Sequence, residues 1–135
     1  MKELTLAAKI DNISAVTAFI DEQLEAADCP IKPQMQIDVA IDELFGNIAH
    51  YAYGEGEGEA TVRFEFDDAT RKATITFIDS GMAFDPLAKP DPNVTLSAQE
   101  RSIGGLGIFL VKKTMDDISY RREDGRNILE IVKYI

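Results

Sequence analysis

One helical stretch in the first half of the chain constrains the fold most, because it carries two distinct faces. Its apolar residues recur three or four positions apart, the spacing of a helix face packed on a core: Ile37, Ile41, Leu44, Ile48 and Tyr51. A second row, rotated by about 100°, holds Ala40, Glu43, Asn47 and His50. Glu43 and Asn47 are four apart, so they lie one turn from each other on one face. A carboxylate that can take a proton, beside an amide oxygen that can bind Mg²⁺, suits phosphoryl transfer. A chance polar pair on a helix edge is the alternative.

Composition predicts a single acidic domain covering residues 1–135. The chain is 45% hydrophobic and 28% charged, and its length is that of one domain with a buried core. Its 14 Lys and Arg against 24 Asp and Glu give a net charge of −10, which disfavours binding along a nucleic-acid backbone. The single cysteine, Cys29, predicts no internal disulfide. No apolar run is long enough for a membrane helix, and no signal-peptide pattern follows Met1. We therefore expect a cytoplasmic protein with no membrane partner.

The order of the expected elements indicates an α+β fold. Alternating and helical patterns place strands at about 3–10, 60–66, 73–78, 118–123 and 128–135, and helices at 13–27, 33–51 and from 108 onward. Asp11 and Asn12 offer an N-cap to the first helix, and an acidic, glycine-rich loop is expected at 53–59. Strands in hairpins and helices that can all cover one face predict a two-layer sandwich. We expect its sheet to be mixed but mostly antiparallel.

An irregular segment at about 80–104 is expected to be a lid, and candidate ligand-binding residues flank it. Asp79-Ser80-Gly81 follows a predicted strand, where the carboxylate could accept a hydrogen bond from an exocyclic amine. Gly81 would let a flat ring approach the backbone, although an ordinary turn explains the same residues. Gly104-Gly105-Leu106-Gly107 stands just before a predicted helix, where backbone N–H groups can bind phosphate. A plain loop-to-helix junction is the alternative. Arg101 either contacts terminal phosphates or is solvated.

These three clusters, in this order, resemble the Bergerat-type ATP-binding domain shared by gyrase B and histidine kinases. Within that group the chain most resembles the bacterial anti-sigma-factor serine/threonine kinases, and the resemblance covers nearly its whole length. The motifs that carry it are Asp42-Glu43-Leu44-Phe45-Gly46-Asn47 with Tyr51-Ala52-Tyr53, Asp79-Ser80-Gly81-Met82-Ala83-Phe84-Asp85-Pro86, and Gly104-Gly105-Leu106-Gly107-Ile108-Phe109-Leu110-Val111-Lys112. Each motif alone is weak, and the ordered set is specific.

The resemblance implies a role for each matching residue, with ATP and Mg²⁺ as cofactors. Glu43 would be the base that accepts the proton of an attacking serine, and Asn47 would ligate Mg²⁺. Asp79 would bind the adenine amine, with Gly81 beside the ring. The remaining ATP-binding residues would be Arg101, Gly104, Gly105, Leu106 and Gly107, some of which would hold the lid hinge. The implied partners are a sigma factor and an antagonist protein with a phosphorylatable serine, with a homodimer possible.

Two features separate the chain from its nearest families. His50 is the sole histidine and has no phosphoacceptor setting, so a histidine kinase is not expected. Many members of the anti-sigma kinase family carry a Gly-Thr pair near the last turn, where the threonine helps form the adenine site. Gly125-Arg126-Asn127 stands there instead, so the effect of Asn127 is left open.

The sequence thus predicts an ATP- and Mg²⁺-dependent protein serine kinase that also binds a regulatory partner. The alternative is a non-catalytic module that uses nucleotide to shape a partner surface. An intact Glu43 favours the enzyme, since binding alone needs no base. A dinucleotide-binding enzyme is disfavoured, because strands and helices do not alternate.

Overall fold

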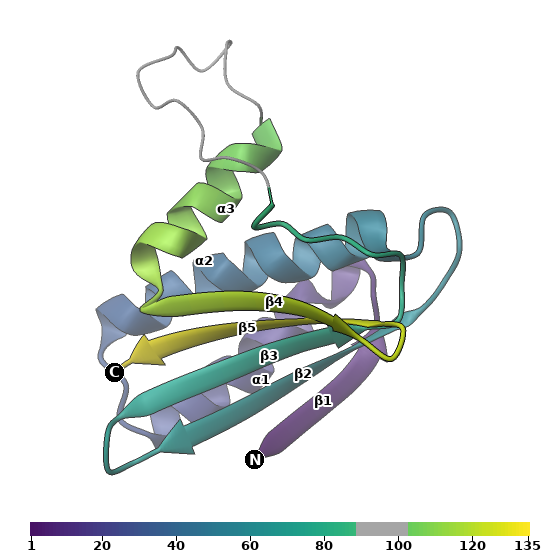
Figure 1. Cartoon of the computed structure of the whole chain (residues 1–135). Helices are drawn as coiled ribbons and strands as arrows, with labels where there is room; N and C mark the ends of the chain where they lie inside the picture. Colours follow the sequence, from purple (N-terminus) through teal and green to yellow (C-terminus); the bar gives the residue numbers. More distant parts are fainter. Residues whose placement is uncertain (89–102) are drawn as a thin grey trace.

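The computed structural model describes residues 1–88 and 103–135, with side chains in the second range from residue 107. Its described residues contain five strands in one sheet: β1 (Lys2–Ala7), β2 (Glu59–Asp67), β3 (Lys72–Asp79), β4 (Asp117–Glu123) and β5 (Arg126–Tyr134). Their order across the sheet is β1-β2-β3-β5-β4 (Figure 1). Every pairing is antiparallel, so the parallel component expected of a mixed sheet does not occur among the described strands.

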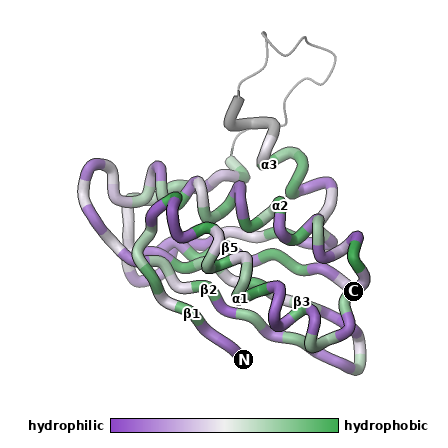
Figure 2. Tube along the Cα trace, turned by 180° about the vertical axis from the view of Figure 1, so that it is seen from behind, coloured by the Kyte–Doolittle hydropathy of each residue, from purple (hydrophilic) through white to green (hydrophobic). Residues whose placement is uncertain are grey.

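The helices lie on one face of this sheet and complete a two-layer α+β sandwich (Figures 1 and 2). They are α1 (Ile13–Ala26), α2 (Ile31–Asn47) and α3 (Ile103–Thr114), with a 3₁₀ turn at Ile10–Asn12 before α1. Hydropathy along the trace alternates between polar and apolar residues in α1 and α2, as a half-buried helix requires (Figure 2). No helix among the described residues is both long enough and apolar enough to cross a membrane.

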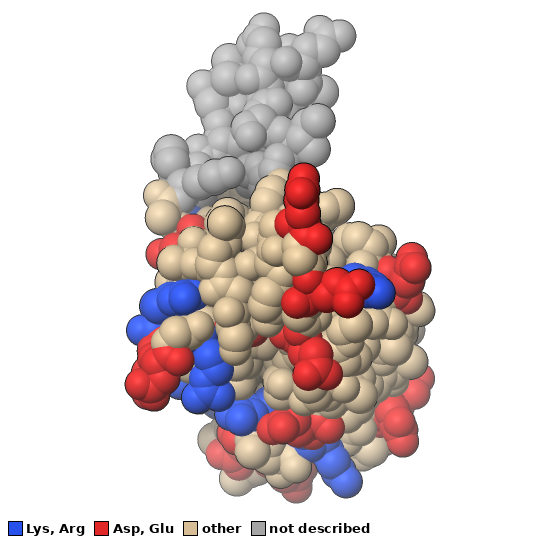
Figure 3. All heavy atoms as spheres, turned by 90° about the vertical axis from the view of Figure 1, so that its right-hand side faces the viewer, with Lys and Arg blue, Asp and Glu red and all other residues tan. Residues whose placement is uncertain are grey.

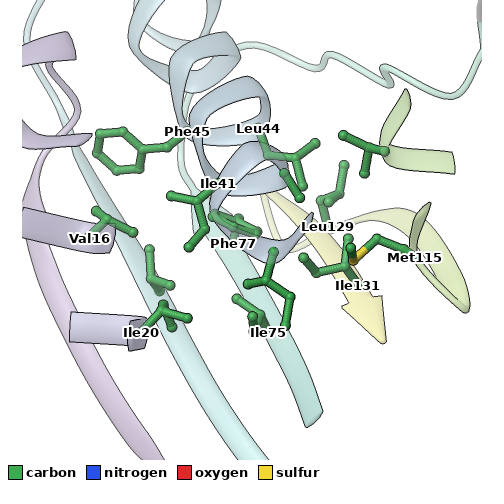
Figure 4. Close-up of a cluster of buried hydrophobic side chains, with 14 of the residues drawn as sticks. Val16, Ile20, Ile41, Leu44, Phe45, Ile75, Phe77, Met115, Leu129 and Ile131 are labelled. Atoms are coloured by element: carbon green, nitrogen blue, oxygen red, sulfur yellow. The ribbon is translucent and has the colours of Figure 1, made fainter. Parts of the chain in front are cut away.

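The core between the layers is built from the residues that the period of each element points inward. Figure 4 shows side chains from α1, from α2, from the residue after α3 and from the central strands meeting there: Val16, Ile20, Ile41, Leu44, Phe45, Ile75, Phe77, Met115, Leu129 and Ile131. The alternation predicted for the hairpin is confirmed, because Val62, Phe64, Ile75 and Phe77 are all buried. Each large apolar side chain buried in this way stabilises the fold by about 1.5–3 kcal/mol.

The end of the second helix differs from the sequence expectation. The α-helical pattern stops at Asn47, and the next residues form a π-helical turn, Ile48–Ala52. A π turn bonds each residue to the fifth one along and so breaks the 3.6-residue period. Tyr51, placed on the apolar stripe by that period, is therefore 48% exposed.

Of two smaller expectations at the ends of elements, the cap by Asn12 is wrong and the acidic loop is confirmed. Asn12 precedes α1, but its side chain caps no helix N–H and donates instead to the carbonyl oxygen of Ala7 at 2.8 Å. The acidic loop after the π turn is folded around one aromatic ring. The Tyr53 hydroxyl donates to the carbonyl oxygen of Glu59 at 2.6 Å and accepts the backbone N–H of Ser80 at 2.9 Å.

Candidate functional site

A pocket opens between the C-terminal part of α2 and the central strands, at the edge where β3 ends. Apolar side chains form most of it, and polar side chains from the helix and from the sheet also line it. The lining residues are Leu44, Asn47, Ile48, Ala52, Phe77, Asp79, Phe84, Pro86, Tyr120, Asn127 and Leu129. Two residues singled out from the sequence, Asn47 and Asp79, therefore lie in one pocket although 32 positions separate them in the chain (79 − 47).

Glu43 stands one turn before Asn47 on α2 and faces the start of α3. A Cβ built on Gly107 would lie 2.1 Å from Glu43 Oε2 and 2.2 Å from its Cδ. The carboxylate thus occupies the space that any side chain at position 107 would need. This contact explains the glycine physically and places the acidic group against the N-terminal half of α3.

Burial raises the pKa of Glu43, and the charge of the neighbouring Asp42 adds to that effect, whereas a hydrogen bond from Asn47 opposes it. A raised pKa makes the carboxylate a better proton acceptor than an ordinary surface glutamate. In that hydrogen bond the Asn47 amide nitrogen is the donor, since a carboxylate only accepts. The Asn47 carbonyl oxygen is therefore left for another partner in the pocket.

Asp79 ends β3 and is the buried acidic group of the pocket, with 5% of its surface exposed. Its Oδ1 atom accepts two hydrogen bonds of 2.9 Å, from the backbone N–H of Gly81 and from the Asn127 side chain. Its Oδ2 atom has no hydrogen-bond partner among the described residues. One carboxylate oxygen is thus held by the protein, and the second remains an acceptor in the pocket wall.

Gly81 has a packing role that the sequence did not suggest. A Cβ at this position would lie 2.1 Å from the carbonyl oxygen of Ala52 and 2.4 Å from its carbonyl carbon. The adjacent residue Met82 donates its N–H to the same oxygen at 2.7 Å. The glycine therefore permits a backbone-to-backbone contact between the loop after β3 and the π turn. Gly81 is not among the residues that line the pocket.

Asn127 on β5 is the polar residue that sequence reasoning left open. It is 5% exposed, and its amide links four segments of chain. Its Nδ2 donates to Asp79 Oδ1 at 2.9 Å and to the carbonyl oxygen of Met82 at 2.8 Å. Its Oδ1 accepts from the Tyr120 hydroxyl at 2.5 Å and from Arg122 Nη1 at 3.1 Å. The position thus contacts the Asp79 carboxylate directly.

Tyr120 and Arg122 belong to the site and were not predicted. A signal for them existed in the turn that joins β4 to β5, because Asp124 and Gly125 both have positive φ angles. A two-residue turn of this kind sets the register, which pairs Arg122 with Asn127. Alternation then places Tyr120 on the same face of β4 as Arg122.

Phe84 and Pro86, from the segment that follows β3, cover the pocket. The Phe84 ring stacks on Tyr51 of the π turn, with centroids 5.3 Å apart and planes 28° apart. This aromatic pair narrows the pocket, so a flat ring that entered beside Asp79 would lie against apolar side chains.

The glycine-rich segment lies elsewhere than expected relative to the helix. Gly104, Gly105, Leu106 and Gly107 do not precede α3 but form its first turns, since the helix begins at Ile103. The weak helix propensity of glycine, about 1 kcal/mol below that of alanine, favours a loop but does not exclude a helix. Arg101 and most of the expected lid lie outside the described residues, as do the side chains at 104–106.

The charge around this end of the molecule bears on which ligands fit. Figure 3 views the end of the molecule at which α2 and β3 terminate; Asp and Glu side chains spread across it, and Lys and Arg gather toward one side. A polyphosphate would meet repulsion here unless a cation accompanied it. Among the described residues no group of three or more His, Cys, Asp or Glu side chains could hold a metal alone. One amide oxygen at Asn47 fits Mg²⁺ that is bound mainly through phosphate oxygens and water.

Comparison with known protein families identifies the domain. The family described as "Histidine kinase-like ATPase domain" matches residues 6–133. The chain belongs to this family. The fold of this ATPase domain is therefore the expected one.

Named relatives of this ATPase domain are kinases. It is 28% identical over 98 residues to the serine/threonine-protein kinase BtrW of Bordetella bronchiseptica, covering 73% of this chain and 68% of that protein. It is 30% identical over 105 residues to the serine-protein kinase RsbW of Listeria innocua, covering 73% and 64%. It is 32% identical over 102 residues to RsbW of Bacillus cereus, covering 72% and 61%. The matched region thus spans about two thirds of these longer relatives.

Proposed function

We propose that this protein is an ATP-dependent protein kinase that phosphorylates a serine of a partner protein. The observation that carries the proposal is the contact between the Glu43 carboxylate and Gly107, next to Asn47, which lines the same pocket as Asp79. A base is not needed for nucleotide binding, so its placement against α3 favours catalysis. The names of the relatives support the same conclusion.

In this mechanism the pocket orients ATP and Glu43 prepares the nucleophile. Asp79 accepts a hydrogen bond from the adenine amine, and the apolar walls around Phe84 exclude water from the ring. The backbone at Gly104, Gly105, Leu106 and Gly107, with Arg101 before it, contacts the phosphates. Glu43 accepts the proton of the attacking serine hydroxyl. The same contact keeps the hydroxyl oxygen in line with the terminal phosphate.

Mg²⁺ fits this arrangement as the second cofactor. The Asn47 amide directs its nitrogen to Glu43, which leaves its oxygen as the ligand that the chain supplies. When bound, the ion neutralises charge on the phosphate oxygens as the phosphoryl group is transferred. The acidic surface of the pocket end makes such a cation necessary for binding a polyphosphate.

Replacement of Glu43 tests the proposal. Glu43→Gln keeps the size of the side chain and its contact with Gly107 but removes the base. We expect it to lower phosphate transfer by about 100-fold or more while ATP affinity changes little. The measurement is transfer of the labelled γ-phosphate of ATP to protein serine in native-cell lysate, detected as phosphoserine. Calorimetric titration with ATP and Mg²⁺ accompanies it. Retained transfer by the variant would exclude Glu43 as the base. Absence of transfer by the wild type, with ATP bound, would favour the non-catalytic module.

The resemblance to anti-sigma-factor kinases extends the proposal to partners. The chain would bind a sigma factor, and its substrate would be an antagonist protein with a phosphorylatable serine. We further propose that residues 1–135 act as one domain in the cytoplasm, with the lid at about 80–104, and that the protein forms a homodimer. Recovery of partners with and without ATP, followed by phosphosite mapping, tests the first part; sedimentation tests the last.

A further inference from the structure

The orientation of the Asn127 side chain is fixed by its neighbours without ambiguity. Both partners of Nδ2, Asp79 Oδ1 and the carbonyl oxygen of Met82, can only accept. Among the partners of Oδ1, Arg122 can only donate, and the Tyr120 hydroxyl donates. A flipped amide would oppose like groups at three of these contacts, so only one orientation satisfies all of them.

The Asn127 amide also joins the Asp79 carboxylate to the hairpin formed by β4 and β5. Arg122 Nη1 donates to the carbonyl oxygen of Gly81 at 2.8 Å as well as to Asn127. The loop that follows Asp79 is thereby held at Gly81 and Met82 from β4 and β5. With Asp79 Oδ1 occupied by two donors, rotation of the carboxylate would break both bonds. Oδ2 therefore stays directed away from this network.

We propose that Asn127, supported by Tyr120 and Arg122, is the positioning residue that makes the pocket selective for 6-aminopurines. It holds Asp79 so that the free oxygen Oδ2 can only accept a hydrogen bond from the ligand. An exocyclic amine satisfies this oxygen, whereas the 6-oxo group of a hypoxanthine or guanine ring would place a second acceptor against it. The inference rests on the proposed function, because it assumes that this pocket binds the purine of the nucleotide.

Other residues at position 127 cannot reproduce these bonds. A threonine hydroxyl donates one hydrogen bond and cannot serve Asp79 and Met82 together. An aspartate offers only acceptors, so it would face the Asp79 carboxylate with a like charge. Buried polar groups left without partners are the usual source of strong discrimination between ligands that differ by one group. The asparagine is thus matched to Tyr120 and Arg122, which supply its donors.

The test compares adenosine diphosphate with inosine diphosphate, which carries oxygen in place of the 6-amine. Calorimetric titration should show that the wild type binds the adenosine form at least about tenfold more tightly. Asn127→Thr and Asn127→Asp should reduce that ratio to about threefold or less, since the Gly81 N–H is then the one remaining donor that holds Asp79 Oδ1 among the described residues. A ratio retained in the folded variants would overturn the inference and leave the proposed function intact. Failure of the wild type to bind adenosine diphosphate would overturn both.

Two milder variants decide the matter if position 127 does not tolerate replacement. Tyr120→Phe and Arg122→Gln each remove one donor to Asn127, and each should lower the ratio to an intermediate value. Arg121→Gln is the matched control, because Arg121 pairs on the surface with Glu123 and makes no bond to the pocket. Thermal unfolding of every variant gives the stability change. Loss of stability with an unchanged ratio in both milder variants would make the network structural only.

Discussion

The candidate catalytic carboxylate of Glu43 lies directly against Gly107 of another helix. They come from α2 and α3, and the carboxylate fills the place where a side chain at 107 would stand. The position of the carboxylate is therefore set by the absence of a side chain opposite it. Since the far end of a glutamate can move more easily than a backbone, any larger residue at 107 would displace the carboxylate.

Gly107→Ala is expected to separate catalysis from nucleotide binding. Position 107 lies within α3, so alanine suits the local backbone, and the added methyl group pushes the Glu43 carboxylate away from the site. We expect phosphate transfer to fall at least about tenfold, in line with the cost of misplacing a catalytic group. ATP affinity should change by less than about threefold. Steady-state transfer rates and calorimetric titration give the two quantities.

Gly46 provides a matched control on α2. A Cβ there meets no other atom within 4 Å, and alanine is favoured over glycine in a helix. Gly46→Ala should therefore raise the free energy of unfolding by about 1 kcal/mol and leave transfer unchanged. If both alanine variants lost transfer equally, the effect would come from the glycine backbone rather than from contact with Glu43.

At the scale of elements, α1 and α2 meet through an apolar layer with an acidic pair beside it. Asp21 on α1 and Asp38 on α2 each bury one Oδ1 atom that has no hydrogen-bond partner among the described residues. Burial raises the pKa of Asp38 to about 7, helped by a hydrogen bond to Asp21 and by the charges of Asp21 and Glu25. Asp38 therefore stays protonated in the folded protein to a higher pH than an ordinary aspartate.

Asp38→Asn should stabilise the protein, and more so at high pH. The folded-state pKa lies above the ordinary value of 3.8, so the folded protein binds the extra proton. The contribution of this pair to stability is complete below about pH 4 and is lost as the pH rises through about 7. Asparagine removes this loss. We expect a gain of about 1 kcal/mol at pH 8, limited by solvent screening, and almost none at about pH 4. Urea unfolding at both pH values measures it.

Asp42→Asn, one turn further along α2, serves as the comparison for that experiment. Asp42 is exposed, so its replacement should change stability little at either pH. An equal gain from both replacements would mean that the general acidity of the chain, rather than the pair between the helices, controls the pH dependence.

Sequence periodicity predicted the elements well where packing follows a regular period. The buried positions of α1, α2 and β3 agree with it, because each element packs one face against the core. It misplaced Tyr51, since nothing in the residues announces a π turn. It also placed the glycines before α3, since weak helix formers at a helix start look like a loop.

Prediction of the site was limited by the same distinction. Glu43, Asn47 and Asp79 belong to short motifs in which a few neighbouring residues already indicate the chemistry. Tyr120 and Arg122 donate hydrogen bonds to Asn127. This grouping can be recognised only once the register of β4 and β5 is known. Gly81 was noticed for the correct property, close approach, but the group that approaches it is the Ala52 backbone.

On the scale of the whole molecule, Arg71 joins three segments at the end of the sheet opposite the pocket. Its Nη2 donates to the carbonyl oxygen of Ala27 at 2.6 Å, and its Nε donates to that of Ile135 at 3.2 Å. The guanidinium also lies 5.0 Å from the centre of the Phe66 ring. Both layers of the sandwich are thus tied through one side chain.

Arg71→Ala should lower the free energy of unfolding by about 2 kcal/mol, because it removes two hydrogen bonds from a charged donor and a cation–π contact. Arg63→Ala should cost less than about 1 kcal/mol, since Arg63 forms a surface ion pair with Glu3. Denaturant unfolding of the two variants provides the measurement. Equal losses would show that the location of Arg71 between the layers has no special weight.

The overall architecture followed from the order of elements, which leaves few arrangements once hairpins and helices are assigned. The two-layer sandwich is confirmed, and only the expected parallel pairing was wrong, since all described pairs are antiparallel. A mixed sheet and an antiparallel one present the same alternation along each strand, so the residues alone did not distinguish them.

The π turn after Asn47 limits how the length of this chain can vary. Deleting one residue from it would restore the ordinary helical period and rotate Ala52 away from Gly81 and Met82. The loop that follows Asp79 would then lose its backbone contact with the turn that ends the Asn47 helix. Insertions and deletions should therefore be tolerated in the acidic loop at 54–58 but not between Asn47 and Tyr53.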